Sequence, residues 1–169
     1  MNRRRAAVTG LVLVLGLVGC AKESSKAAGD GDELTWQEAK ARTQAMELEI
    51  AESLPQDKLA NVDQELTGLL IRCSDSSVNW HGATTVTLIE GTDPEPLVRE
   101  LEEKYQDSRF AIKVRDPAPA GHYEVQLRSP DDAEMYIIKR GAEEPYTIRI
   151  ASGSACFPWL EGEYMGGKF

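Results

Sequence analysis

The stretch VNWHGATTVTLIE, residues 78–90, decides the fold class because apolar and polar side chains alternate along it. Such alternation is typical of a β-strand with one buried face and one solvated face. Strands of a parallel sheet that is covered on both faces are continuously apolar instead. The stretch therefore predicts an antiparallel sheet with one covered face. The apolar face would carry Trp80, Val86 and Leu88, and the polar face His81, Thr85 and Thr87.

Five other short runs predict further strands of the same sheet. Residues 122–128 alternate in the same way, and residues 69–73 precede a polar turn that makes them a hairpin with the first stretch. The remaining runs are residues 110–114, 135–138 and 146–150, with proline-, glycine- or aspartate-containing turns between them. We therefore expect a mainly antiparallel sheet of about five to six strands.

A first amphipathic helix is predicted to cover the apolar face. Thr35 followed by Glu38 forms a capping box, and Pro55 ends the run that it starts. The buried stripe of this helix would consist of Trp36, Ala39, Thr43, Met46, Ile50 and Leu54. The same stripe could form a coiled-coil seam, but a single short amphipathic helix more commonly covers a sheet.

A second helix is predicted to start at Pro94, with Thr92 or Asp93 as its cap, and to end near Gln106. Its apolar face would carry Leu97, Leu101 and Tyr105. Two helices on one face of an antiparallel sheet define an α+β two-layer sandwich.

The first twenty residues have the organisation of a bacterial export signal. Three arginines at residues 3–5 precede an apolar run, residues 6–18, which is shorter than the ~20 residues that a membrane-spanning helix needs. The run ends in LVGC, residues 17–20, which resembles the lipobox of bacterial lipoproteins. The resemblance implies that residues 1–19 are removed and that diacylglycerol on Cys20 anchors the protein at the extracytoplasmic face of the cell membrane. An ordinary signal peptide with a cysteine near its end is the alternative.

Residues 20–33 comprise this cysteine and a polar, glycine-containing segment that is predicted to be a flexible linker. Its thirteen residues after Cys20 would have a root-mean-square reach of about 20 Å. Without residues 1–19 the chain has 16 basic and 28 acidic side chains, a net charge of −12. This charge repels phosphate groups, so we expect no nucleic-acid partner.

Cys73 and Cys156 remain once Cys20 is assigned to lipid. In an exported protein, two remaining cysteines most simply form one disulfide. A reactive thiol or a metal pair is the alternative, which is disfavoured because the cysteines are far apart, no CxxC is present and the chain has only two histidines. The disulfide would fasten the first predicted strand to the end of the last.

The sequence contains no recognisable catalytic or cofactor motif. Glycine-rich phosphate loops, GxSxG and HExxH are absent, so no catalytic residue, cofactor or metal ligand is assigned. The tightest polar group is His122-x-Glu124 on one strand face, which His81 would join if its strand were a neighbour. These residues could hold a metal, or Glu124 could pair with Lys113 or Arg128 across strands.

The polar sheet face as a whole is a stronger candidate for binding than any single residue. An open face of mixed charge can hold an envelope protein, a peptide or a glycan, although it also keeps a one-sided sheet soluble. Its side chains are Lys113, Arg115, His122, Glu124, Gln126, Arg128, Thr147 and Arg149.

Residues 158–169 form an aromatic tail behind a globular domain of residues 34–157. The tail contains Trp159, Tyr164 and Phe169. It either docks on the domain or serves as a recognition segment, and docking is favoured because it follows the predicted disulfide.

As a whole, the chain resembles small lipoproteins of actinobacteria and, in outline, the LppA-type mycobacterial lipoproteins. The matching features are the lipobox, the acidic linker, LIRCS at 70–74, the strand with Trp80 and SGSACF at 152–157. Because these families have no assigned activity, the resemblance implies location and fold but no reaction. We expect a non-enzymatic binding or scaffolding module of the cell envelope. An envelope hydrolase or metal-dependent enzyme with a dispersed site, and a carrier of a small apolar ligand, are the alternatives.

Overall fold

The computed structural model describes residues 33–118, 121–142, 144–160 and 162–169. Cys20, the predicted signal peptide and the predicted linker up to residue 32 lie outside the described residues. The described part belongs to one unit that begins at Glu33 and includes the aromatic tail. Within it, no helix has the length and apolar character needed to cross a membrane.

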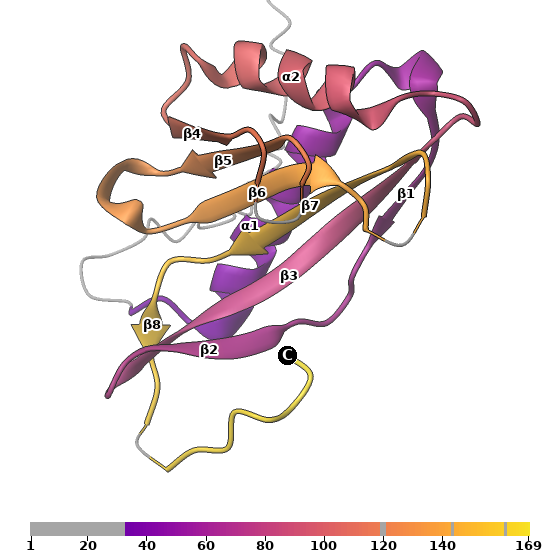
Figure 1. The fold of residues 1–169 in the computed structure, drawn as a ribbon. Coiled ribbons are helices and arrows are strands. Elements are labelled where there is room, and N and C mark those ends of the chain that lie inside the picture. Colours follow the sequence, from indigo (N-terminus) through magenta and orange to yellow (C-terminus); the bar gives the residue numbers. More distant parts are fainter. Residues whose placement is uncertain (1–32, 119–120, 143, 161) are drawn as a thin grey trace, which may run out of the picture. The chain divides into compact units, whose positions relative to one another are not determined.

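Two α-helices and eight strands make up this unit (Figure 1). The helices are α1 (Trp36–Glu52) and α2 (Pro94–Tyr105), accompanied by short 3-10 turns at Gln56–Lys58 and Pro130–Asp132. The strands are β1 (Leu59–Gln64), β2 (Leu69–Ser74), β3 (Ser77–Leu88), β4 (Ala111–Arg115), β5 (Glu124–Arg128), β6 (Met135–Arg140), β7 (Thr147–Gly153) and β8 (Phe157–Pro158).

Every strand pairing is antiparallel, which confirms the predicted fold class. The main order across the sheet is β1-β3-β7-β6-β5-β4. The long strand β3 has two partners along each edge: β1 and β2 pair with successive parts of one edge, and β7 and β8 with parts of the other. The sheet thus has eight strands where about five to six were predicted.

The two unpredicted strands have no strong local signal. β1 has the sequence LANVDQ, in which most side chains are polar or exposed, because it lies at an edge of the sheet. β8 is only two residues long and includes Pro158. One predicted strand is also shorter than expected, since β5 begins at Glu124 and leaves His122 and Tyr123 in the preceding loop.

Both helices cover the same face of the sheet. α1 packs on β3 and β7 and passes behind them in Figure 1, whereas α2 packs on β6 and β5. α1 starts at the predicted capping box, in which the Thr35 hydroxyl accepts from the Glu38 N–H and the Glu38 carboxylate accepts from the Thr35 N–H. Asp93 caps α2. Each cap therefore provides a side-chain acceptor for one of the N–H groups that the first turn of its helix leaves free.

The main core lies between the helices and the centre of the sheet. It is built from aliphatic and aromatic side chains of α1, α2, β3, β5, β6 and β7. Its buried members are Met46, Ile50, Ala51, Leu54, Val86, Leu88, Leu97, Val98, Leu101, Tyr105, Phe110, Tyr123, Val125, Leu127, Tyr136, Ile138, Ile148 and Ile150.

A second apolar cluster, called the aromatic end, lies where β2, β8 and the start of α1 meet. Its buried members are Ala39, Leu70, Val78, Trp80 and Phe157, with Leu34, Trp36, Trp159, Met165 and Phe169 packed against them. The ring of Trp80 fits only because two neighbours are glycines: a Cβ at Gly82 would lie 2.0 Å from the ring, and one at Gly68 2.5 Å. Glycine permits this close approach and larger residues do not.

A polar layer separates the main core from the aromatic end. On α1, Thr43 and Glu47 lie between the two clusters, and on β3 Thr84 lies between Trp80 and Val86. All three polar side chains are fully buried. α1 therefore contacts the sheet through two apolar clusters, and hydrogen-bonding side chains lie between them.

The aromatic tail docks on the aromatic end instead of standing free. Gly68 and Phe169 exchange two backbone hydrogen bonds of 2.7 and 3.2 Å, and Trp80 Nε1 donates to the Phe169 carbonyl oxygen at 3.2 Å. The rings of Trp36 and Trp159 each meet Phe169 edge-on, with centroids 5.7 Å apart. The tail is consequently part of the folded body.

Candidate functional site

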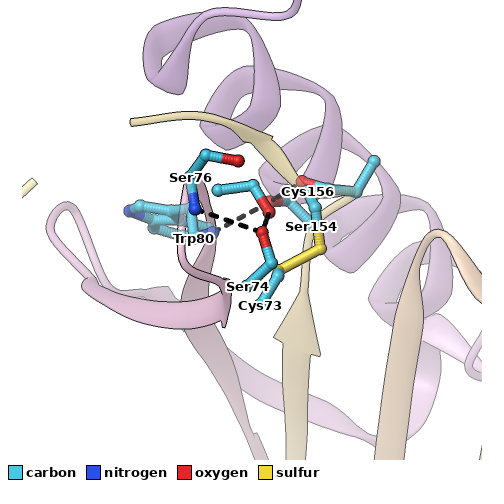
Figure 2. Close-up of a disulfide and its surroundings, with 8 residues drawn as sticks. Cys73, Ser74, Ser76, Trp80, Ser154 and Cys156 are labelled. Carbon is cyan, nitrogen blue, oxygen red and sulfur yellow. Dashed lines mark hydrogen bonds between the residues drawn. A yellow bond between two sulfur atoms is a disulfide. The ribbon is translucent and has the colours of Figure 1, made fainter. Parts of the chain in front are cut away.

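The predicted disulfide between Cys73 and Cys156 is confirmed, with an S–S distance of 2.03 Å and a sequence separation of 83 residues. It joins the end of β2 to the segment between β7 and β8 (Figure 2). Beside it, Trp80 and Ser154 are paired: the Trp80 N–H donates to the Ser154 hydroxyl and the Ser154 N–H to the Trp80 carbonyl, each at 2.9 Å. The disulfide therefore links β2, on one side of Trp80, to the segment between β7 and β8, on its other side.

The predicted group of His81, His122 and Glu124 does not converge. β3 and β5 are separated by β7 and β6, so His81 and Glu124 are at least about 14 Å apart at the usual strand spacing. The register also places Arg128, not Glu124, level with His81 across the sheet. His81 packs against Gly153 on β7 instead, and burial lowers the pKa of its imidazole. Among the described residues there is no group of three or more His, Cys, Asp or Glu side chains that could hold a metal.

Glu124 is paired across strands, although with other partners than Lys113 or Arg128. Its carboxylate lies 3.5 Å from Arg115 Nη1 on β4 and 3.8 Å from Lys139 Nζ on β6. It also accepts from Gln126 Nε2 at 2.8 Å. Antiparallel register explains the choice, because Arg115 and Lys139 are the residues directly opposite Glu124.

These pairs belong to a charged row that crosses all six strands of the main order on the face away from the helices. Directly opposed residues of neighbouring strands form the row. Its members, in order across the sheet, are Asp63, Thr85, Arg149, Lys139, Glu124 and Arg115. Arg149 and Lys139 are two cations side by side, an arrangement that is unfavourable unless other groups balance it.

Arg149 is held in place by two partners. Its Nη1 donates to Thr85 Oγ1 at 3.0 Å, and its Nη2 forms an ion pair of 2.6 Å with Glu65 Oε1. The guanidinium is thereby drawn toward β3 and β1, while Lys139 is drawn toward Glu124 on the other side. The two cations are oriented apart, and the outer face between them stays polar.

A polar groove of about 700 Å³ opens on this part of the outer face. Its floor consists of the charged row from Asp63 to Lys139 and a second row formed by Asn61, Thr87 and Thr147, which also face one another across β1, β3 and β7. One wall is the β6–β7 turn, which contributes Gly141, Ala142 and Glu144.

The turn that walls the groove is fixed by several hydrogen bonds. Gly141 N–H donates to the Thr147 carbonyl at 2.8 Å, and the Thr147 hydroxyl donates to the Glu144 carbonyl at 2.8 Å. Tyr146 has a φ of 61°, a conformation that non-glycine residues rarely adopt. Its carbonyl accepts from Leu88 N–H at 2.7 Å, which ties the turn to β3.

A second hollow of about 590 Å³ continues along β3 toward the aromatic end and shares Arg149 with the polar groove. It opens where β1 has ended and β2 has not begun, so that the loop at 65–68 borders it. Leu66, Leu69, His81 and Lys168 line it together with Arg149. The outer face is therefore hollowed along much of the length of β3.

The buried carboxylate of Glu47 lies on the opposite face, in the polar layer. It accepts from the Thr84 hydroxyl at 2.8 Å, from Gln64 Nε2 at 3.1 Å and from the Ser152 hydroxyl. Burial raises its pKa, although these hydrogen bonds oppose the effect. Glu47 lies on the same stripe of α1 as Thr43 and Ile50. An acidic residue within an otherwise apolar stripe is the sequence feature that could have indicated a buried carboxylate.

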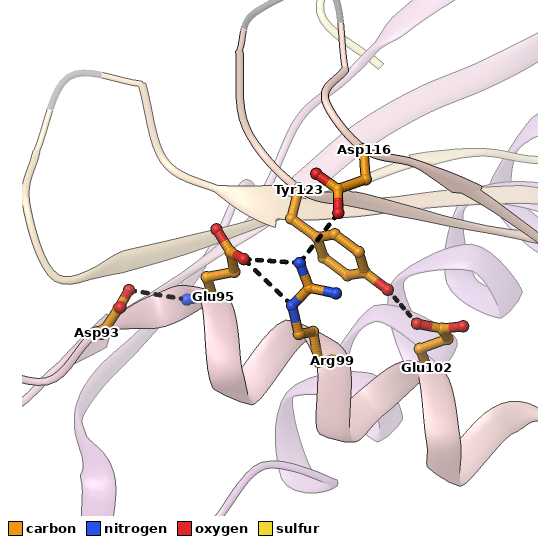
Figure 3. A network of polar contacts seen from close by, with 6 residues as sticks. All are labelled: Asp93, Glu95, Arg99, Glu102, Asp116 and Tyr123. Atoms are coloured by element: carbon orange, nitrogen blue, oxygen red, sulfur yellow. Dashed lines mark hydrogen bonds and ion pairs between the residues drawn. The ribbon is translucent and has the colours of Figure 1, made fainter.

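A polar network on α2 joins that helix to the sheet (Figure 3). Arg99 bonds Glu95 at 2.8 Å and Asp116 at 3.2 Å, and its guanidinium lies 3.7 Å from the centroid of the Tyr123 ring. The Tyr123 hydroxyl donates to Glu102. Burial first, and Glu102 second, raise the pKa of Tyr123 to about 12. Because these groups satisfy one another, the network serves to hold α2.

The predicted face residues are thus divided between two areas. Thr147 and Arg149 line the polar groove, whereas Lys113, Arg115, Glu124, Gln126 and Arg128 lie on β4 and β5. Glu124 and Gln126 are buried, so this side of the face is less open to water than predicted. The groove residues Asn61, Asp63 and Lys139 were not predicted.

Comparisons with protein-family models, with curated proteins and with solved structures found no match.

Proposed function

We propose that the protein is a lipid-anchored module of the cell envelope that binds a polar peptide segment of an envelope partner in the polar groove and catalyses no reaction. The anchor is diacylglycerol on Cys20, as the lipobox at residues 17–20 predicts. The binding part of the proposal depends on one observation: a groove of about 700 Å³ whose floor is built from polar side chains of four strands. This volume lies within the usual range for ligand sites.

The composition of the groove favours a peptide. Asp63 and Glu144 supply negative charge, Lys139 and Arg149 supply positive charge, and threonine hydroxyls lie between them. A peptide with side chains of both signs complements such a surface, because its charges can be placed opposite these groups. The residues that line the groove include no aromatic ring on which a sugar could stack.

The other two functions have weaker support. An enzyme that uses His81, His122 and Glu124 is disfavoured because the strands hold His81 at least three strand spacings from Glu124. A carrier of an apolar ligand between the helices and the sheet is disfavoured because the main core fills that space.

Site-specific photo-crosslinking in intact envelopes tests the binding site. A photoreactive amino acid at position 87, on the groove floor, should give a discrete adduct with a polypeptide, whereas the same group at position 103 on exposed α2 should not. Arg149→Ala should reduce the adduct about tenfold or more, and the matched change Arg42→Ala on α1 should leave it unchanged. An equal yield from positions 87 and 103 would contradict the proposal, and an adduct with a saccharide would replace the peptide by a glycan.

The anchor is tested separately with Cys20→Ser. This variant should lose incorporation of labelled palmitate and should no longer be processed as a lipoprotein. Continued palmitate incorporation at the wild-type level would show that the lipid is attached elsewhere and would contradict the assignment of Cys20.

A further inference from the structure

Exposed apolar side chains gather at the aromatic end. Five of the nine large apolar residues that are exposed in the described part of the chain occur there, with exposed fractions between 48% and 81%. They are Leu66, Leu69, Ile71, Leu160 and Tyr164. Leu69 and Ile71 point to the outer face of β2, whereas Leu160 and Tyr164 belong to the tail that closes the lower end of Figure 1. Clustered exposed apolar residues indicate a surface that contacts a partner or a membrane.

An apolar groove lies beside Leu160 at the start of α1. It has a volume of about 680 Å³ and is lined by Trp36, Pro158, Trp159 and Leu160, among others. Trp36 and Trp159 are only partly buried. Amphipathic aromatic side chains of this kind are enriched where proteins meet the interface between lipid and water.

The position of the first described residue favours a membrane as the partner of this surface. Glu33, the first described residue, lines the same groove. Thirteen residues separate Cys20 from Leu34, and a chain of that length spans at most about 45 Å. A lipid on Cys20 therefore keeps the aromatic end within about 45 Å of the bilayer, because the chain enters the body at this end.

We propose that the aromatic end rests on the bilayer, with Leu160, Tyr164, Trp36 and Trp159 in the interfacial region of the lipid. This inference rests on the proposed lipid anchor and adds a second contact to it. A single point of attachment supplemented by interfacial side chains binds membranes more firmly than either contact alone. Charges of both signs lie beside the patch, since Arg72 contacts Met165 and Glu163 lines the apolar groove. The contact is accordingly with neutral, zwitterionic headgroups.

This orientation explains where the polar groove lies. Ile71 faces Asn79 on β3, and the groove floor contains Thr85, six residues further along the same strand. A strand advances about 3.4 Å per residue, so the groove floor lies about 20 Å along the strand from Ile71, which is at the end that we place on the bilayer. A soluble segment of an envelope partner can reach it there.

Tryptophan fluorescence in vesicles tests the contact. The processed, lipidated protein is reconstituted into phosphatidylcholine vesicles whose acyl chains carry bromine, a quencher that acts at short range. Emission from Trp36 and Trp159, identified by Trp36→Phe and Trp159→Phe, should fall at least twofold relative to unbrominated vesicles. Trp80, which is fully buried, should be quenched far less.

Paired variants decide whether the patch is responsible. Leu160→Ser with Tyr164→Ser should restore most of the emission, whereas Leu48→Ser with Ile89→Ser, two exposed residues outside the aromatic end, should not. All four positions are solvent-exposed, so unchanged circular dichroism and melting confirm that both proteins remain folded. Protein that floats with vesicles without quenching overturns the lipid contact and leaves the anchor intact. Protein that is not lipidated and does not float overturns the anchor, and the contact with it.

Discussion

The main core and the aromatic end are stabilised by different kinds of interaction. The main core has 18 buried apolar residues from both helices and the centre of the sheet. The aromatic end has only five, and β2 and β8 each pair with β3 alone. A small apolar cluster buries little surface and needs additional constraints. Here these are the disulfide, the docked tail and the hydrogen bonds of Trp80.

The polar layer keeps the two clusters distinct. The hydroxyls of Thr84 and Ser152 both donate to the Glu47 carboxylate where continuous apolar packing would otherwise join the clusters. Hydrogen bonds require particular distances and directions, whereas apolar contacts tolerate sliding. We infer that this layer sets the register of α1 on the sheet, and each prediction below weakens one of the two regions or the layer between them.

The largest expected effect comes from removing the disulfide. Cys73→Ser with Cys156→Ser opens a loop whose ends are 83 residues apart in sequence, and loop-closure entropy predicts a loss of up to about 4.5 kcal/mol in the free energy of unfolding. Urea denaturation measures the loss, and hydrogen exchange should show β2 and β8 opening before β6 and β7. Reduction of the wild type is the control and should give the same result. A loss below about 1 kcal/mol would mean that packing alone holds the aromatic end.

Deleting residues 160–169 should have the next largest effect. The Trp80 indole N–H then loses its partner, and Phe169 no longer contacts Trp36 and Trp159. A buried donor without a partner costs about 1–3 kcal/mol, and each aromatic pair contributes about 0.5–1.5 kcal/mol. These contributions span about 2–6 kcal/mol. We expect a loss in the lower half of that range, about 2–4 kcal/mol, because the bond of Trp80 Nε1 is only partly buried and water can replace it. The loss is seen as a lower melting temperature. Tyr164→Ser, in an exposed part of the same tail, should change it little, and a truncated protein that melts like the wild type would refute docking.

The third prediction concerns the polar layer and depends on pH. Because burial raises the pKa of Glu47 above its ordinary value of 4.5, the folded protein binds this proton more tightly than the unfolded chain does. Stability contributed by the protonated form is therefore present below that value and is lost as the pH rises through the folded pKa. Glu47→Gln cannot titrate, so its stability relative to the wild type should rise between pH 4 and pH 7.

Urea denaturation of both proteins at pH 4, 5.5 and 7 measures the difference. At pH 4 the two should agree to within about 1 kcal/mol, since an amide can still bond the two hydroxyls. Glu49→Gln, a change at an exposed position on the same helix, is the matched control. If the stabilities of the wild type and Glu47→Gln changed with pH in parallel, the Glu47 carboxyl group would have the same pKa in the folded and unfolded protein, and the prediction would fail.

Local pattern was sufficient to predict the faces of the strands but not their neighbours. The alternation around Trp80 and Thr85 correctly separated the covered face from the outer face. The polar face was predicted as a binding candidate, but the position of the groove on it was not. That position depends on β3 lying beside β7, which places Arg149 opposite a residue 64 positions earlier. No pattern within the sequence of either strand indicates that they pair. Glu47 was missed for another reason, since an acidic residue within an apolar stripe is ordinarily assigned to water.

The smallest effect is expected at the far edge of the main core, where Tyr123 and Arg99 hold α2. Tyr123→Phe removes the hydrogen bond to Glu102 but keeps the ring beneath the guanidinium. The expected loss is about 0.5–1 kcal/mol, typical of one partly exposed hydrogen bond, because the main core beneath holds α2 by apolar packing. Tyr123→Leu also removes the cation–π contact and should cost more.

Absorbance titration gives this last prediction an independent readout. The pKa of Tyr123 is raised to about 12, so the difference between the wild type and Tyr123→Phe at 295 nm should develop near pH 12, well above the ordinary value of 10. A loss comparable to that of the disulfide variant would mean that side-chain bonds, not packing, hold the main core at this edge. The main core and the aromatic end would then both depend on specific bonds more than on apolar packing, and the difference between them would not hold.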